Sequence, residues 1–134
     1  MAAMRVREWM SPDPVTAEPT TTVAEARHLL HYYGIRHLPV VEDGRVVGMV
    51  SDRDLRQDPS APRNREADER ELAAVMSSPA HVVDLDASVT DAARLMLSRR
   101  ISALPVVDGP DRRLVGMITT TDCLLASLSP QPSA

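Results

Sequence analysis

Residues 35–54 read IRHLPVVEDGRVVGMVSDRD, and this stretch decides the fold because it occurs twice. The second copy is residues 101–122, ISALPVVDGPDRRLVGMITTTD. Towards the N-terminus, an offset of 66 residues aligns eight identical residues within positions 23–41. Beyond residue 41 the offset becomes 68, so the second copy has two extra residues, which we place in a longer hairpin turn. The chain is therefore an internal duplication.

Both copies carry the same order of predicted elements, which is β-α-β-β-α after a short leading helix. Apolar residues recur at helical spacing after Thr22 and after Ser88, and an acidic residue three positions later suggests a capping box at each start. Asp43-Gly44 predicts a two-residue hairpin turn. The expected elements are short helices ending near Met10 and Met76, extended stretches 15–17 and 82–84, helices 23–33 and 89–99, strands 38–42, 45–50, 104–108 and 113–118, and last helices beginning at Ser51 and Thr119.

The ends of the two long helices differ in sequence. Gly34 can adopt the left-handed conformation that commonly ends a helix. Arg100 occupies the equivalent position in the second copy, so we expect that helix to end differently.

The duplication predicts an α/β (α+β) fold of two repeats packed sheet to sheet with pseudo-two-fold symmetry. A unit of about 50 residues cannot bury both faces of a small sheet by itself, so we expect the copies to meet and leave clefts between them. The expected boundaries are residues 5–56 for the first repeat, 57–71 for a polar, solvated linker, 72–128 for the second repeat and 129–134 for a tail.

Composition narrows the function. The net charge is −4 and no basic stripe is present, which argues against nucleic acid as a partner. No long apolar segment or signal peptide is evident, so we expect a cytoplasmic protein without a membrane partner. A single cysteine, Cys123, excludes an internal disulfide.

The repeated motifs identify a resemblance. Residues 35–41 with 48–55, and residues 101–107 with 116–122, are similar to the two halves of a cystathionine-β-synthase-type (CBS) domain pair, or Bateman module. The resemblance covers residues 5–128 and implies a stand-alone regulatory pair. It further implies an adenosine-containing ligand in the cleft, such as AMP, ADP, ATP or an S-adenosyl compound. A homodimer, no required cofactor and no catalytic activity also follow from it, and the protein partner stays unknown.

The family pattern assigns ribose binding to Asp54 with Ser51, and to Asp122 with Thr119. A carboxylate offers two acceptor oxygens to two adjacent hydroxyls. The same S/T-x-x-D spacing also predicts a capping box at the start of the last helix. Both interpretations stay open, because a capped helix N-terminus can also face an anion.

The resemblance also implies phosphate contacts next to the LPVV motif, from Arg36 and His37. Arg53 and its counterpart Thr121 are further candidates, as cation and hydroxyl respectively. The alternative is an exposed basic pair at the entrance of a strand. The second copy has Ser102 and Ala103 at these positions, which predicts two unequal sites.

Backbone and apolar groups of the extended stretches are expected to frame the adenine, although plain strand packing explains them equally well. Asp84 stands out there as an acidic residue that would repel a phosphate or favour a cationic ligand such as a sulfonium. The adenine-framing candidates are Val15, Thr16, Ala17, Ile35, Val82, Val83 and Ile101.

Other candidate sites are weaker. His28 and His31 are three residues apart on one predicted helix, but no further metal ligand accompanies them, so no metal is expected. Cys123 has no activating base nearby in the sequence and is expected to be packed. No nucleophile–base set or catalytic motif is present, so we expect no enzyme. The alternative to ligand sensing is a ligand-free pair that binds another protein through an exposed apolar helix face.

Overall fold

Both repeats form the predicted hairpin in the computed structural model, which describes residues 4–56 and 65–129. Strand β2 (His37–Glu42) pairs antiparallel with β3 (Arg45–Ser51), and β5 (Ala103–Asp108) pairs in the same way with β6 (Arg113–Thr119). Each register shifts once at the same place in the repeat, a β-bulge after the second residue of the PVV motif. The hairpins are therefore equivalent in detail as well as in sequence.

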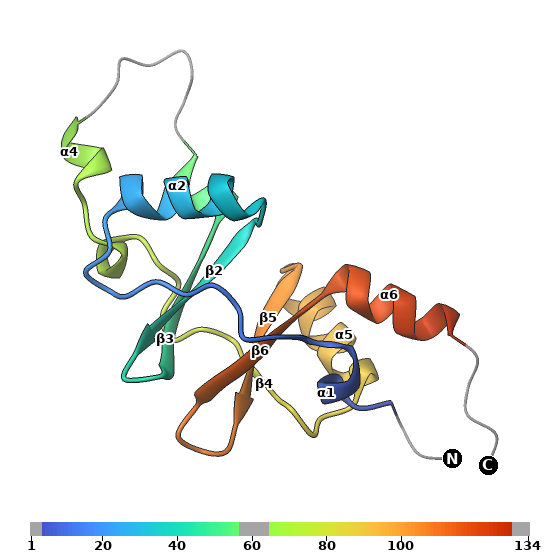
Figure 1. Cartoon of the computed structure of the whole chain (residues 1–134). Helices are drawn as coiled ribbons and strands as arrows, with labels where there is room; N and C mark the ends of the chain where they lie inside the picture. Colours follow the sequence, from blue (N-terminus) through green and yellow to red (C-terminus); the bar gives the residue numbers. More distant parts are fainter. Residues whose placement is uncertain (1–3, 57–64, 130–134) are drawn as a thin grey trace. The chain divides into compact units, whose positions relative to one another are not determined.

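The helices surround these hairpins in the predicted order (Figure 1). The two long helices span the predicted residues, and no helix in the described ranges has the length and apolar character needed to cross a bilayer. The remaining elements are α1 (Val6–Trp9), β1 (Ser11–Pro12), α2 (Val23–Tyr33), α3 (Asp52–Leu55), α4 (Arg65–Asp68), the 3₁₀ helix η1 (Leu72–Ala74), β4 (Val83–Asp84), α5 (Val89–Arg99) and α6 (Thr120–Leu128).

Helix α2 begins with a complete capping box. Thr22 Oγ1 accepts a hydrogen bond from the Glu25 amide at 3.1 Å, and the Glu25 carboxylate accepts one from the Thr22 amide at 3.1 Å. At α5, Ser88 Oγ accepts from the Asp91 amide at 3.0 Å, and this is the half of the box that forms. Local side-chain bonds therefore set both helix starts.

Helix α5 ends as α2 does, so the expectation of a different ending is wrong. Gly34 ends α2 with φ 63° and ψ 35°, and Arg100 ends α5 with φ 55° and ψ 44°. Both residues donate their amide to carbonyls one turn back in the helix. Arg100 adopts the left-handed conformation despite the steric strain at its Cβ, and it allows the Ile101 amide to donate to the Met96 carbonyl at 3.0 Å, which closes the helix end.

The described residues form two compact units that do not follow the repeat boundaries. Residues 15–80 make one unit, which we call the first-repeat unit, and residues 4–14 with 81–129 make the second-repeat unit. Each unit therefore contains one repeat and the short segment that precedes the other repeat in the chain. Residues 4–14 precede the first repeat but belong to the second-repeat unit. In the first-repeat unit, the Leu72 amide donates to the Thr21 carbonyl at 2.8 Å, and the Val6 amide makes the equivalent bond to Ala87 in the second-repeat unit at 2.9 Å.

Each unit has its own aliphatic core between a long helix and a hairpin. In the first-repeat unit, Ala26 and Leu30 of α2 pack with Leu38, Val40 and Val50, all nearly inaccessible to solvent. The second-repeat unit repeats this arrangement with the following buried residues: Ala92, Met96, Leu104, Val106 and Ile118. The chain has no Phe, and both cores are built from aliphatic side chains and methionine.

A glycine in the second strand of each hairpin allows the short segment from outside the repeat to pack closely against that strand. A Cβ on Gly116 would lie 2.8 Å from the Ser11 carbonyl oxygen and 2.6 Å from Met10 Sδ. A Cβ on Gly48 would collide with Met76 Sδ and lie 3.1 Å from the Ser77 carbonyl oxygen. Only glycine allows this close backbone approach.

The polar segment 57–71 is not wholly a solvated linker. Residues 57–64 lie outside the described residues, as do residues 130–134 of the expected tail. Residues 65–68 form α4, and Asp68 is buried at 8% exposure. A buried carboxylate requires a partner, which the sequence pattern did not predict.

The left-handed end of α5 generates a prediction. Replacing Arg100 with Gly removes the steric strain of the Cβ at an exposed position. We expect the free energy of unfolding, measured in urea, to rise by about 0.5–1 kcal/mol. The control is Arg99→Gly, one residue earlier, where the backbone is helical and glycine should destabilise by about 1 kcal/mol. A destabilised Arg100→Gly variant would show that this backbone is not strained.

Candidate functional site

The carboxylate of Asp54 lies at the start of α3, beside the end of strand β3. Asp54 Oδ2 accepts a hydrogen bond from the Ser51 amide at 2.8 Å, and the Asp54 amide donates to Ser51 Oγ at 3.2 Å. These two bonds form a capping box, so the capping interpretation is confirmed. The second oxygen, Oδ1, accepts no hydrogen bond from the rest of the described chain. Capping therefore leaves one acceptor oxygen of an exposed carboxylate available.

Asp122 occupies the equivalent place at the start of α6. Its Oδ2 accepts from the Thr119 amide at 2.8 Å and from Thr119 Oγ1 at 3.0 Å, and its own amide donates to Thr119 Oγ1 at 3.2 Å. Oδ1 again has no hydrogen-bond partner among residues 4–56 and 65–129. In both predicted ribose-binding pairs the two residues are therefore in contact, and the Oδ1 atom of each aspartate takes no part in the cap.

Two predicted phosphate ligands lie at the same end of the first hairpin as Asp54. His37 is opposite Ser51 in the β2–β3 register, and the Asp52 amide donates to the Arg36 carbonyl oxygen at 2.7 Å. Partial burial of the imidazole lowers the pKa of His37, the Arg36 charge lowers it further, and Asp54 and Asp52 oppose both. Burial therefore disfavours the charged form of His37 in the free protein.

The remaining charges around Asp54 are exposed. Arg53 is exposed on the single turn of α3, next to Asp54 in the chain. Asp52, which the sequence reasoning did not consider, forms an exposed ion pair with Arg56 at 3.4 Å. A cation four residues away therefore offsets the negative charge that Asp52 would otherwise present to a phosphate.

The second-repeat unit has the same backbone arrangement around Asp122 but lacks the cations. We call the two arrangements the Asp54 frame and the Asp122 frame. Ser102 replaces Arg36, and its carbonyl oxygen accepts from the Thr120 amide at 3.0 Å. Ala103 replaces His37 and is buried, and exposed Thr121 replaces Arg53. The frames are thus alike in backbone geometry and unlike in charge.

The extended stretch 15–17 runs beside strand β2. The Ala17 amide donates to the Pro39 carbonyl at 3.0 Å, and its carbonyl accepts from Val41 at 2.8 Å. Because backbone groups alternate in a parallel pair, those of Thr16 point away from β2, and its side chain is exposed. Val15 and Ile35 pack on the core.

Strand β4 holds the equivalent position in the second-repeat unit. Val83 lies opposite Val106 in a parallel register and is buried, and Val82 is half-buried. Ile101 packs on the core of this unit. Of the adenine-framing candidates, Ala17 and Val83 are therefore core residues, and their neighbours Thr16 and Val82 are the more accessible.

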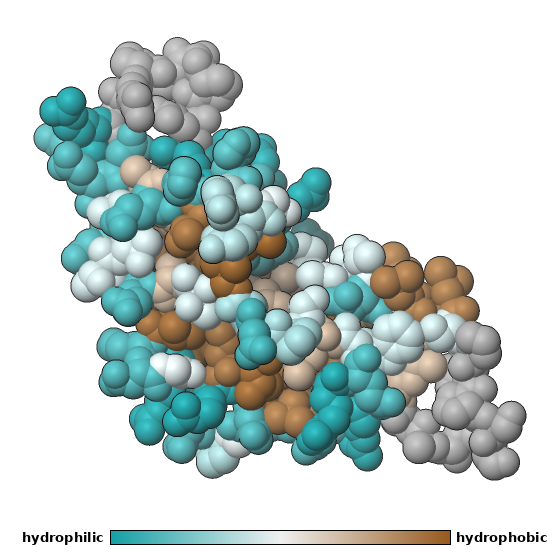
Figure 2. Space-filling model, viewed as in Figure 1, coloured by the Kyte–Doolittle hydropathy of each residue, from teal (hydrophilic) through white to brown (hydrophobic). Residues whose placement is uncertain are grey.

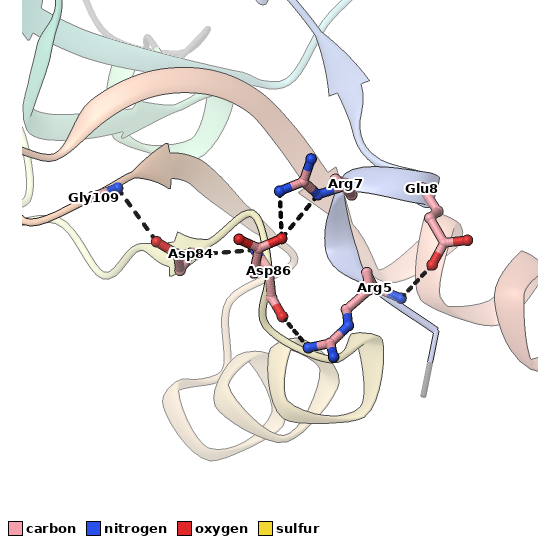
Figure 3. Close-up of polar contacts among 6 residues, drawn as sticks. All are labelled: Arg5, Arg7, Glu8, Asp84, Asp86 and Gly109. Atoms are coloured by element: carbon pink, nitrogen blue, oxygen red, sulfur yellow. Dashed lines mark hydrogen bonds and ion pairs between the residues drawn. The ribbon is translucent and has the colours of Figure 1, made fainter. Parts of the chain in front are cut away.

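Asp84 is a structural residue (Figure 3). Its Oδ1 accepts from the Asp86 amide at 2.9 Å, and its Oδ2 accepts from the Gly109 amide at 3.4 Å. The carboxylate thereby joins the end of β4 to the turn of the β5–β6 hairpin. Both oxygens have backbone donors, so Asp84 has a structural role, and its effect on the charge of a ligand stays a prediction.

The next carboxylate, Asp86, fastens the N-terminal segment to the same loop (Figure 3). Arg7 forms an ion pair with Asp86 Oδ1, and Arg5 donates to the Asp86 carbonyl oxygen at 2.6 Å. The Glu8 carboxylate accepts a hydrogen bond from the Arg5 amide at 2.8 Å and so caps the N-terminus of α1. These contacts connect residues about 80 positions apart, which no local motif could predict.

Sequence reasoning also missed Arg27 and Asp68. Arg27 Nη1 donates to Asp68 Oδ1 at 2.9 Å, and its Nε donates to the Leu55 carbonyl oxygen at 3.0 Å. The available signal was a difference between the repeats, because Ala93 stands at the position equivalent to Arg27.

Cys123 follows Asp122 on α6 and packs against the core of the second-repeat unit. Partial burial raises the pKa of its thiol, and the Asp122 charge raises it further. A thiol with a raised pKa is a poor nucleophile at neutral pH, which agrees with the predicted packing role.

Comparison with known proteins identifies the repeats. The family model described as the CBS domain matches residues 6–59 and 71–129. Inosine-5′-monophosphate dehydrogenase of Mycobacterium tuberculosis is 38% identical over 116 residues, covering 84% of this chain and 20% of that protein. The chain therefore spans about a fifth of that enzyme's length. The CBS domain-containing protein YhcV of Bacillus subtilis is 31% identical over 124 residues, 92% of this chain and 86% of that protein.

Solved structures of similar chains confirm the fold. The CBS domain pair of protein MJ0100, in complex with 5′-methylthioadenosine and S-adenosyl-L-methionine, has a TM-score of 0.79 at 27% identity, covering 94% of this chain and 97% of that one. CBSX2 of Arabidopsis thaliana, in complex with AMP, has a TM-score of 0.79 at 28% identity, covering 93% and 96% of the two chains. The predicted α+β pair of CBS repeats is thus confirmed.

The lowered pKa of His37 generates a prediction about pH. The unfolded chain binds a proton on this imidazole near pH 6.5, and the folded chain binds it only at lower pH. The unfolded state therefore holds more protons in that window, so this contribution to stability is complete above pH 6.5 and is lost as the pH falls below it. We expect His37→Gln to lose less stability than the wild type between pH 7.5 and 5, measured by urea unfolding.

The control for this experiment is His81→Gln, which removes an exposed imidazole from the other unit. If both substitutions flattened the pH dependence equally, the effect would not belong to His37.

Proposed function

Since this chain belongs to the CBS domain family and forms a tandem pair, we propose that it is a regulatory module that binds an adenosine-containing ligand. The observation that carries the proposal is the exposed carboxylate of Asp54, fixed by its capping box with one oxygen unused, next to Arg36 and Arg53. No catalytic step is part of this proposal.

The ribose is the part of the ligand that Asp54 and Asp122 would hold. Capping fixes each carboxylate before any ligand arrives, so binding needs little further ordering of the side chain. A hydroxyl that donates to Oδ1 would form a charge-assisted hydrogen bond, which is stronger than a neutral one. Ser51 and Thr119 keep the carboxylates in position.

A phosphate group on the ligand would favour binding to the first-repeat unit over the second. Arg36 and Arg53 supply cations beside Asp54, and a phosphate there would draw a proton onto His37 and raise its pKa again. The equivalent residues of the second-repeat unit are Ser102, Ala103 and Thr121, which carry no charge. We therefore assign AMP, ADP or ATP to the Asp54 frame, and a ligand without phosphate to the Asp122 frame.

The adenine would be read by the backbone near Thr16 in the first-repeat unit and near Val82 in the second. The amide and carbonyl groups of Thr16 point away from β2, so they can serve as donor and acceptor for a base edge. The AMP complex of CBSX2 and the S-adenosyl-L-methionine complex of MJ0100 support this ligand class for the present chain.

A thermal-shift panel of AMP, ADP, ATP, NAD and S-adenosylmethionine tests the proposal. A ligand at a hundred times its Kd stabilises the folded state by about 2.7 kcal/mol, so we expect the melting temperature to rise by several degrees with at least one nucleotide. Asp54→Asn should reduce nucleotide affinity about tenfold, roughly 1.4 kcal/mol, because the amide lacks the negative charge.

Asp122→Asn is the matched control for this substitution. The asparagine oxygen can still accept the capping bond, so neither variant should lose more than about 1 kcal/mol of stability. Equal affinity losses in calorimetry would contradict the assignment of the nucleotide to the Asp54 frame, and no shift at millimolar ligand would contradict the function itself.

An apolar face on α6 supports a further part of the proposal, association into a homodimer. Leu124, Leu125 and Leu128 are 63%, 52% and 81% exposed, and Figure 2 shows the brown patch they make over this helix. Exposed apolar patches commonly mark interaction sites. The same face would also serve the alternative function, a ligand-free pair that binds another protein.

Light scattering at micromolar concentration tests the homodimer. We expect a dimer for the wild type and a monomer for the double variant Leu124→Glu with Leu128→Glu, because charge would be buried without a partner. Thr90→Glu places the same charge at an exposed position of α5 and should remain dimeric. A monomeric wild type would rule out the homodimer and favour a different protein partner for this face.

A further inference from the structure

We propose that Arg27 is a positioning residue for the Asp54 site, because its guanidinium holds the one-turn helix α3 in place. The inference rests on the proposed function, and it adds a residue outside the predicted ligand contacts. Arg27 is on α2, far from Asp54 in the sequence, and acts through the Leu55 carbonyl group.

The guanidinium joins three separate segments of the first-repeat unit. Its Nε donates to the Leu55 carbonyl oxygen at 3.0 Å, and its Nη1 donates to Asp68 Oδ1 at 2.9 Å. The Arg27 side chain is 34% exposed and that of Asp68 is 12% exposed. Asp68 is largely shielded from water, and its ion pair keeps the partly exposed guanidinium directed at the end of α3.

Helix α3 needs such support because it is short. It contains four residues, and the next residue, Arg56, is already extended at φ −66° and ψ 130°. The Arg56 amide makes a long hydrogen bond of 3.4 Å to the Arg53 carbonyl. A single turn is unfavourable by itself, since nucleation fixes several residues for few hydrogen bonds.

The equivalent helix in the second repeat needs no such support. Helix α6 has nine residues and its own series of helical hydrogen bonds, and Ala93 stands where the first repeat has Arg27. The arginine therefore occurs only in the repeat whose last helix is a single turn. This difference is what a positioning role predicts.

The geometry also explains why arginine is required. One planar guanidinium presents donors in two directions at a fixed angle, so it reaches a carbonyl and a carboxylate together. Leu55 has its side chain in the core at 2% exposure and its carbonyl oxygen on Arg27. Asp54 precedes Leu55 directly, so Ser51 holds its carboxylate and the Arg27–Leu55 bond holds the backbone that follows it.

The test compares AMP affinity in three variants by calorimetry, at a temperature where all are folded. Arg27→Met removes both hydrogen bonds and should weaken AMP binding about tenfold. Asp68→Asn removes the ion pair but leaves the bond to Leu55, so its loss should be smaller. Thr22→Ala removes the N-cap of the same helix α2; it should lower the melting temperature but leave AMP affinity near the wild-type value.

Hydrogen exchange at the Asp54 amide gives a readout that needs no ligand. We expect faster exchange in Arg27→Met than in Thr22→Ala, with α6 amides unchanged in both. If the wild type does not bind AMP, the proposed function fails, and this exchange rate still decides the role of Arg27. Wild-type AMP affinity in Arg27→Met, or equal exchange in the two variants, would overturn the proposal.

A folding defect in Arg27→Met would not prevent the decision. Arg27→Lys keeps a cation opposite Asp68 but lacks the planar fork that reaches Leu55. Affinity between those of the wild type and Arg27→Met, or exchange faster than in Thr22→Ala, supports the positioning role, and wild-type behaviour in both measurements overturns it.

Discussion

The close approach of a short chain segment to a strand glycine is the constraint on which each unit depends. Gly116 and Gly48 leave no space for a Cβ against Ser11 and Ser77, and the residues before each serine bond to the start of a long helix. Because each segment precedes the opposite repeat in the chain, neither repeat body is complete without residues encoded beside the other. The duplication in sequence thus becomes an exchange of segments in structure.

The capping boxes at α3 and α6 fix the two carboxylates to which we assign ribose binding. Asp54 and Asp122 complete the helix starts with one carboxylate oxygen and keep the other free of hydrogen bonds within the described chain. A ligand-binding group that is already held by the fold loses little conformational entropy on binding. In the proposed function, capping therefore prepares each carboxylate for a ligand.

The two repeats have diverged mainly in charge and in helix length. The first repeat has cations around its aspartate, a single-turn last helix and an arginine that supports that helix. The second has neutral residues, a longer last helix and an exposed leucine face. A common backbone frame thus carries two different surfaces, which is the basis for assigning different ligands to the two units.

The sequence by itself determined the elements whose signals are local: the hairpins with their turns, the spans of the two long helices, and the caps at Thr22, Ser51 and Thr119. These depend on contacts within a few residues, so spacing and residue type suffice to predict them. The pairing of Asp54 with Ser51 was predictable for the same reason, and the family resemblance pointed to the same residues.

Only the tertiary structure decided which segment completes which unit, that Asp68 is buried within a highly charged stretch, and that Asp84 accepts a hydrogen bond from the Gly109 amide. It also lowers the pKa of His37, since burial and the Arg36 charge outweigh the nearby carboxylates there. The physical reason is the same in each case. The partners are brought together by packing between segments distant in the chain, and no periodicity or short motif records that packing.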